Sequence, residues 1–111
     1  MLSSYRLPKN RRPTHPGVIL EETRADLRLT QQQMAASLGI TRGRYAGIES
    51  GKRAVSLDTA LRLERVFGTD AQSWMNMQIA VDLWDALHDR TFDEIKKLKP
   101  HKNMGRRAAL T

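Results

Sequence analysis

Two helix starts, separated by a single glycine, stand in the stretch TQQQMAASLGITRGRYAGI, residues 30–48. Thr30 can cap the first helix while the side chain of Gln33 reaches back to the cap backbone, which is the spacing of a capping box. Thr41 is placed to cap the second helix. Hydrophobic residues flank both caps at the spacing of a hydrophobic staple, Leu29 with Met34 and Ile40 with Tyr45. Local chemistry therefore predicts two independent helices.

The connection between these helices is short. Gly39 follows Leu38 where the first helix must stop, and glycine adopts the positive φ of such a turn at little steric cost. Ala35 lies one helical turn earlier, and its methyl group lets the second helix cross closely. The residues expected to face inward are Met34, Leu38, Ile40, Tyr45 and Ile48. This pattern predicts a helix-turn-helix, which holds its second helix against a DNA groove; an ordinary antiparallel helix pair with a solvated charged face is the alternative.

The outward face of the second helix is expected to carry Arg42, Gly43, Arg44 and Gly47. An arginine fork matches two acceptors of guanine, so both arginines are predicted to contact base edges or the flanking phosphates. The two glycines either allow close approach to a duplex or are tolerated surface positions. The ring of Tyr45 is expected in the core rather than at a phosphate.

Further phosphate contacts are predicted on either side of that helix. Gln31, at the start of the preceding helix, is expected to bond a phosphate together with the backbone amides of the helix terminus. Lys52 and Arg53 follow in a loop from which side chains reach the DNA backbone without entering a groove. The predicted DNA-contacting set is Gln31, Thr41, Arg42, Gly43, Arg44, Gly47, Lys52 and Arg53.

Helical spacing of apolar residues continues on both sides of the motif. It predicts helices over residues 17–27, 56–67 and about 70–87. In the helix over 56–67, the residues expected to face inward are Leu57, Ala60, Leu61, Leu63 and Phe67. A further short helix is expected to start with a capping box at Thr91 and Glu94, to dock through Phe92, Ile95 and Leu98, and to stop before Pro100.

These elements predict an all-α fold. Residues 1–16 contain three prolines and four basic side chains and are expected to form a flexible basic arm. The five-helix domain is expected over 17–90, with a basic extension over 91–111.

The helix over 70–87 holds the richest apolar stretch of the chain. One stripe along it is formed by Trp74, Met77, Val81 and Trp84, and further apolar residues widen this stripe. A helix that is apolar over so much of its circumference is either central in its own domain or shared with a second chain. We favour the second interpretation, a homodimer contact through these four residues.

The formal net charge is +7, and the excess lies at the two ends of the chain. Residues 1–15 and 91–111 each carry +4, whereas 16–90 carries −1. Within that body, a local basic stretch over 42–53 contains Glu49 as its only acid. Such a patch favours a polyanion, through salt-dependent phosphate contacts. RNA is an alternative polyanion, but the aromatic platforms of RNA-binding sheet modules need strands that this pattern does not predict.

Other function classes find little support in the sequence. The absence of cysteine excludes disulfides, thiolate catalysis and cysteine zinc sites. His15, His88 and His101 lack metal-ligand spacing, and His15 is expected at a helix entry. No nucleophile motif is present, so we expect no enzyme activity, metal, cofactor or small-molecule substrate. The apolar runs are too short for a membrane helix and no secretory signal pattern is present, so we expect no membrane contact and a cytoplasmic location.

Strings on both sides of the motif add a narrower resemblance. They are RPTHPG at residues 12–17, GKRAVSLDTALRL at 51–63, FGT at 67–69, WMNMQ at 74–78 and DLW at 82–84. Together with the helix-turn-helix, these strings resemble the HigA-type antitoxins of the phage-repressor (Cro/C1, XRE) family. The family often has a polar or basic side chain where this chain has Gly47, which shifts the expected base reading onto Arg42 and Arg44.

This resemblance implies a dimeric, lambda-repressor-like five-helix repressor of the bacterial cytoplasm, associated with the nucleoid when bound to DNA. It implies binding to an inverted-repeat operator in front of its own operon, and neutralisation of a cognate mRNA-cleaving toxin by direct binding. A stand-alone phage-type repressor without a toxin partner is the alternative. The toxin-contact surface stays open between the basic ends of the chain and the acidic residues Glu21, Glu22, Asp82, Asp85 and Asp89.

Overall fold

The computed structural model describes residues 11–102, which form six α-helices and no strand. The helices are α1 (Pro16–Asp26), α2 (Gln31–Leu38), α3 (Arg42–Glu49), α4 (Leu57–Phe67), α5 (Ala71–Leu87) and α6 (Arg90–Ile95). The predicted all-α class is confirmed, and α6 lies where a further short helix is expected from the sequence. Residues 1–10 and 103–111, which belong to the predicted basic arm and extension, lie outside the described residues.

The ends of α2 and α3 are formed by the residues that the sequence pattern indicates. The Thr30 hydroxyl accepts from the amide of Gln33 at 3.1 Å, and the Gln33 side chain accepts from the Thr30 amide at 2.9 Å, which completes the capping box. The Thr41 hydroxyl accepts from the Arg44 amide at 3.1 Å and caps α3. Gly39 ends α2 with a φ of 69°, the left-handed conformation expected for the turn.

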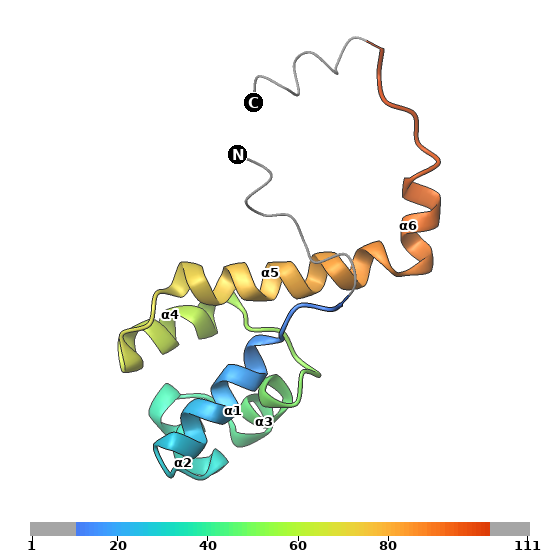
Figure 1. Cartoon of the computed structure of the whole chain (residues 1–111). Coiled ribbons are helices and arrows are strands. Elements are labelled where there is room, and N and C mark those ends of the chain that lie inside the picture. Colours follow the sequence, from blue (N-terminus) through green and yellow to red (C-terminus); the bar gives the residue numbers. More distant parts are fainter. Residues whose placement is uncertain (1–10, 103–111) are drawn as a thin grey trace.

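The helices pack in two groups that share one core (Figure 1). Helices α2 and α3 cross at the turn, and α1 packs against α3. Helix α4 packs against both α2 and α5. Helix α5 is the longest and extends past the others, with α6 turning away at its far end (Figure 1).

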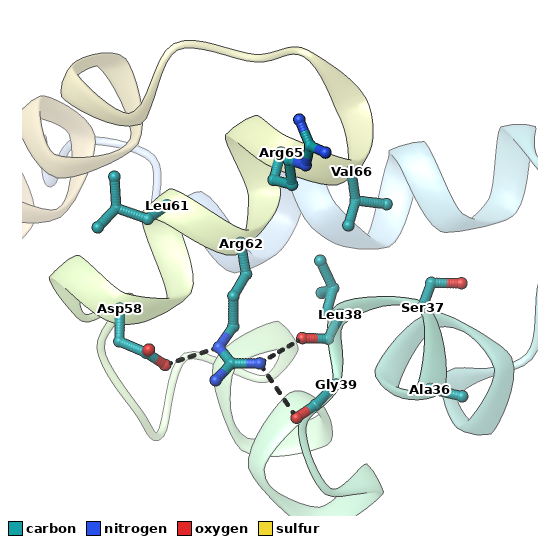
Figure 2. Close-up of a pocket in the computed structure, with 9 residues that line it drawn as sticks. All are labelled: Ala36, Ser37, Leu38, Gly39, Asp58, Leu61, Arg62, Arg65 and Val66. Atoms are coloured by element: carbon teal, nitrogen blue, oxygen red, sulfur yellow. Dashed lines mark hydrogen bonds and ion pairs between the residues drawn. The ribbon is translucent and has the colours of Figure 1, made fainter.

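A side chain of α4 joins that helix to the helix-turn-helix. Figure 2 shows Arg62 reaching across the pocket between α2 and α4. Its Nε donates to the Asp58 carboxylate at 2.9 Å, and its Nη1 donates to the carbonyls of Leu38 at 3.0 Å and Gly39 at 3.3 Å. Arg62 therefore satisfies carbonyls at the C-terminus of α2 that the helix itself leaves without partners.

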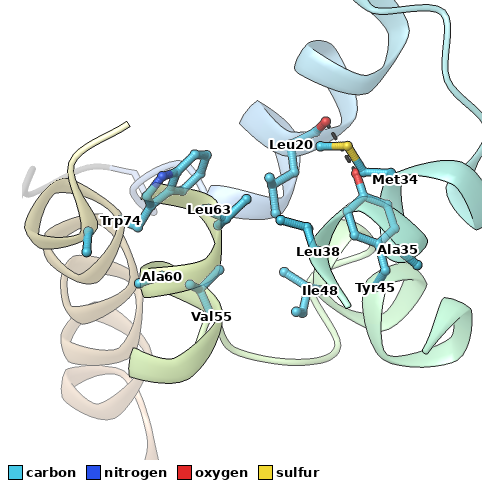
Figure 3. Packing of buried hydrophobic residues seen from close by; sticks show 11 residues of the cluster. Leu20, Met34, Ala35, Leu38, Tyr45, Ile48, Val55, Ala60, Leu63 and Trp74 are labelled. Carbon is cyan, nitrogen blue, oxygen red and sulfur yellow. Dashed lines mark hydrogen bonds between the residues drawn. The ribbon is translucent and has the colours of Figure 1, made fainter. Parts of the chain in front are cut away.

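The core is built from every helix except α6 (Figure 3). Its buried hydrophobic residues are Leu20, Met34, Ala35, Leu38, Tyr45, Ile48, Val55, Ala60, Leu63, Ala71, Trp74 and Val81. Tyr45 is fully buried, and its hydroxyl donates to the Leu20 carbonyl at 3.4 Å. The prediction that this ring packs in the core is confirmed. Ile40, also expected inward, is half-buried against the cluster.

Two of the residues expected to face inward on α4 do not. Leu57 is 61% exposed and Leu61 is 52% exposed. Ala60 and Leu63 are buried, and they set the inward direction of the helix. Leu57 and Leu61 lie on the neighbouring side of the same helix, which faces solvent in this chain because no described helix covers it.

The start of α6 also differs from prediction. The helix begins at Arg90 with Asp89 at its N-cap, and the Thr91 hydroxyl donates to the Asp89 carboxylate at 3.1 Å, so Thr91 caps nothing. Ile95 is 51% exposed and Leu98 73% exposed, so neither docks as expected, while Phe92 is half-buried. The physical reason is the position of α6 beyond the end of the core, where it meets α5 and little else (Figure 1).

Candidate nucleic-acid interface

Helix α3 carries few side chains of its own on its outer surface. Tyr45, Ile48 and Glu49 are the buried residues of this helix. Arg42 and Gly43 are exposed, whereas Gly47 is half-buried. At Gly43, where an added Cβ would meet no atom within 4 Å, the helix can bring its backbone close to a partner surface.

The N-terminus of α1 packs against the C-terminal end of α3. A Cβ on Gly17 would collide with the backbone carbonyl oxygens of Ile48 and Glu49, so α1 and α3 approach as closely as a glycine allows. His15 positions this contact, because its Nδ1 accepts from the Gly17 amide at 2.9 Å. Burial lowers the pKa of His15, which keeps the ring nitrogen available as an acceptor. The expectation of a helix-entry role for His15 is confirmed, whereas the role of Gly17 was not predicted.

Glu49 is the buried acid that ties the helix-turn-helix to α1. Its carboxylate accepts from Arg24 Nε at 2.8 Å and Arg24 Nη2 at 2.9 Å, and from Gln31 Nε2 at 3.0 Å. The Arg24 guanidinium lowers the pKa of this carboxyl to about 2. The sequence pattern marks Glu49 only as the acid of a basic stretch. Its position one residue after the inward Ile48 is the local signal for its burial.

This ion pair also affects Gln31, which was predicted to bond a phosphate. Gln31 is half-buried at the first position of α2, with its side-chain amide nitrogen committed to Glu49. The backbone amides at the start of α2 stay beside it. A phosphate contact at this place stays a prediction.

Arg44 departs from the outward position expected for it. Its Nη2 donates to Thr59 Oγ1 at 2.9 Å, Ser56 Oγ at 3.2 Å and Asp58 Oδ2 at 3.3 Å, so the guanidinium lies on the N-terminus of α4. The side chain is 34% exposed. The reason is tertiary, since α4 brings three oxygen acceptors within reach of α3.

Lys52 and Arg53 lie exposed in the loop after α3, as predicted. The chain turns back at Gly51, with a φ of 82°, and the Arg53 amide then donates to the Gly47 carbonyl at 3.0 Å. Within residues 11–102, the side chains of Arg42, Lys52 and Arg53 have no hydrogen-bond acceptor or ion-pair partner. These three cations are therefore available to an external anion.

The predicted dimer stripe on α5 is largely internal. Trp74 is 5% exposed and Val81 is 1% exposed within a single chain, contrary to the prediction that they meet a second chain. Met77 packs against the core, and the half-buried Trp84 stacks on His88. The apolar residues that α5 leaves exposed are Ile79, Leu83 and Leu87. The sequence pattern does not separate the buried face of α5 from the exposed one, because this helix is apolar on several sides.

The described part of the chain shows neither a cluster of metal ligands nor a membrane-spanning helix. Within residues 11–102, no three histidine or acidic side chains gather as a metal site would require. None of the helices there combines the length and the apolar character that crossing a membrane demands.

Comparison with known proteins identifies the family. A helix-turn-helix family model matches residues 20–74. The chain is 45% identical to virulence-associated protein I of Dichelobacter nodosus over 84 residues, which cover 74% of this chain and 78% of that protein.

Solved structures agree with this assignment. An addiction module antidote protein of the HigA family from Coxiella burnetii matches with a TM-score of 0.73 and 38% identity, covering 82% of this chain and 100% of that one. The Pseudomonas aeruginosa antitoxin HigA, solved with the higBA promoter, matches with a TM-score of 0.73 and 32% identity, covering 80% of this chain and 98% of that one. The chain belongs to the phage-repressor (Cro/C1, XRE) helix-turn-helix family, in its HigA group.

Proposed function

We propose that this protein is a sequence-specific DNA-binding antitoxin that represses its own toxin–antitoxin operon. The observation that carries the proposal is the surface around α3, where Arg42, Lys52 and Arg53 have no acceptor within the described chain and the outer side of the helix carries two glycines. A surface of this shape and charge fits the major groove of a duplex. The similarity to an antitoxin solved with promoter DNA supports the same use.

The groups on and around α3 have distinct roles in this proposal. Arg42, at the first position of α3, reaches base edges at the end of the helix that enters the groove. Lys52 lies in the loop after α3 and contacts the phosphate backbone. The backbone amides at the start of α2, beside Gln31, bind a further phosphate. Arg44 supports α3 from the side through its bonds to α4.

The proposal includes a homodimer that reads an inverted repeat. Two copies place their α3 helices about one turn of DNA apart, roughly 34 Å. The contact between copies is assigned to the exposed apolar side of α5, which carries Ile79, Leu83 and Leu87. Burying these residues against a second copy removes apolar surface from water.

A toxin partner is the second part of the proposal, and it rests on the HigA family of the solved relatives. Among the acidic residues considered for this contact, Asp85 is engaged by Arg12 in an ion pair of 2.8 Å and Asp82 accepts from Gln78. Glu21 and Glu22 lie exposed and adjacent on α1, where no such pair engages them. We assign the toxin contact to these two glutamates, because a protein that binds RNA presents a basic surface.

The test is a gel-shift titration of the full chain against the duplex upstream of its own gene, with and without the neighbouring gene product. We expect a retarded complex that a random duplex of equal length does not compete away. Arg42→Ala should weaken binding to the upstream duplex more than to the random one, because a base contact carries the discrimination. Lys52→Ala should weaken both and reduce the slope of log affinity against log salt by about one.

Arg65→Ala is the matched control, since it removes one positive charge from α4 rather than from the surface around α3. Equal affinity for the upstream and random duplexes would overturn the regulatory part of the proposal. If the chain binds the upstream duplex but the neighbouring protein neither binds to nor alters that complex, the toxin part of the proposal fails. The protein would then be a stand-alone repressor.

A further inference from the structure

Arg53 lies directly across the outer surface of α3. An ideal Cβ built on Gly47 stands 2.8 Å from Arg53 Cδ, 3.0 Å from Cγ and 3.2 Å from Nε. The stem of Arg53 therefore fills the space into which a side chain at residue 47 would project. A Cβ built on Gly43, one turn earlier, meets no atom within 4 Å, so this filling is particular to Gly47.

The backbone holds Arg53 in this place. The left-handed Gly51 reverses the chain after α3, and the bond from the Arg53 amide to the Gly47 carbonyl, at 3.0 Å, brings the two residues together. Contact with α3 thus restrains the aliphatic part of the side chain. The guanidinium beyond it has no acceptor within residues 11–102.

This arrangement differs from that of Arg44, the neighbouring arginine on α3. The Arg44 guanidinium already bonds three oxygens of α4, whereas the Arg53 fork is free at the outer side of the helix. A restrained stem with a free planar fork is well suited to a guanine edge, because less side-chain freedom is lost on binding and the fork matches two acceptors.

We propose that Arg53 supplies the base-reading side chain that α3 lacks at Gly47. This arginine then contacts a base edge and determines sequence preference, instead of contacting only the phosphate backbone. Gly47 is then the positioning residue, because its missing Cβ makes room for the Arg53 stem. This inference rests on the proposed DNA-binding function and names a residue that carries its specificity.

The experiment starts with selection of preferred duplexes from a randomised library by the full-length wild-type chain. Affinities for the selected duplex and for a random duplex are then measured for Arg53→Ala, Arg53→Lys, Gly47→Ala and the double variant Gly47→Ala/Arg53→Ala. Arg65→Ala serves as the charge control, and circular dichroism checks that every variant is folded.

Arg53→Ala should reduce the preference for the selected duplex by roughly tenfold or more, the range expected for one good bidentate pair. Arg53→Lys should lose most of that preference while keeping the wild-type salt slope, since lysine keeps the charge without the fork. Gly47→Ala should lose preference without any change in charge, and should have no further effect when Arg53 is already alanine.

The inference is overturned if Arg53→Lys keeps the wild-type preference, which would make the contact one to phosphate alone. It is equally overturned if Gly47→Ala has the same effect with and without Arg53, which would mean that the added methyl group meets DNA directly. A wild-type chain that selects no sequence would instead overturn the proposed function, and this inference with it.

Discussion

At the scale of single residues, Glu49 holds the two helices of the helix-turn-helix against α1. Its side chain is 5% exposed, and its carboxylate joins α3 to Arg24 on α1 and Gln31 on α2. Arg24 also donates to the Leu29 carbonyl at 3.0 Å, so the same side chain bonds a backbone acceptor in the loop between α1 and α2. A buried charge is tolerated here because it is paired and fully hydrogen-bonded.

Glu49→Gln should destabilise the domain at neutral pH by about 3 kcal/mol, since it leaves the Arg24 guanidinium without its charge partner. The pKa of Glu49 falls from 4.5 to about 2 on folding. Its stabilisation is therefore complete above the unfolded-state value and is lost as the pH falls toward about 2. Urea unfolding at several pH values measures the free energy of unfolding. As the pH falls from 4.5 toward about 2, this free energy should decrease less in the variant than in the wild type.

The matched control is Glu22→Gln on the exposed side of α1, for which we expect a change within about 0.5 kcal/mol. If the free energy of unfolding decreases as much at acidic pH in Glu49→Gln as in the wild type, this ion pair does not contribute to stability.

At the scale of elements, the start of α1 and the end of α3 approach each other as closely as a glycine allows. Gly17 allows the two backbones to meet, and His15 caps the helix that carries it. Because α3 is short, with eight residues, its direction depends on such neighbours rather than on its own stability. The contact therefore controls the direction of α3, the helix at the centre of the proposed DNA-binding surface.

Gly17→Ala should destabilise the domain by about 2 to 3 kcal/mol or more, because the added methyl group collides with rigid backbone and forces α1 and α3 apart. Gly43→Ala, the same change in a place where a Cβ meets no atom, should be neutral or stabilising by up to about 1 kcal/mol. Thermal unfolding of both variants measures the difference. A Gly17→Ala protein as stable as Gly43→Ala would contradict the close approach.

At the scale of the whole molecule, the long helix α5 has one buried apolar side and one exposed apolar side. Trp74 and Val81 complete the core of one chain, and the Trp74 indole donates to Thr69 Oγ1 at 2.7 Å. The exposed residues Ile79 and Leu83 lie on the other side, one helical turn apart. Exposed apolar residues at this spacing form a surface that a second copy can cover.

We expect the proposed dimer to appear in sedimentation velocity of the wild type and Leu83→Glu to shift it to monomer, because a charge would have to be buried at the contact. Operator binding should weaken in parallel, since each monomer then reads one half-site. Leu27→Glu, at an exposed leucine that caps the C-terminus of α1, introduces the same charge on another helix and should leave the dimer intact. Unchanged sedimentation of Leu83→Glu would remove this side of α5 from the dimer contact.

Much of the fold could be predicted because its signals are local. Thr30 with Gln33, Thr41, and Gly39 act within one turn of their own positions, and these caps and the turn appear in the structure as expected. The helical spacing of apolar residues predicted the remaining helices and their order, and the family strings agreed with a five-helix domain. The candidate interface was predicted in part, since Arg42, Lys52 and Arg53 lie exposed where the sequence placed them.

The sequence by itself thus determined the helices, the turn between α2 and α3, and the basic character of the surface beside them, because each depends on neighbours a few residues apart. Only the tertiary structure decided that Glu49 meets Arg24, 25 residues away, that Arg44 lies on α4, and that Arg53 covers Gly47. It also decided which side of α5 is buried, since a helix apolar on several sides carries no periodic signal for its inward face. These outcomes depend on how closely one helix packs on another, a distance that no local pattern encodes.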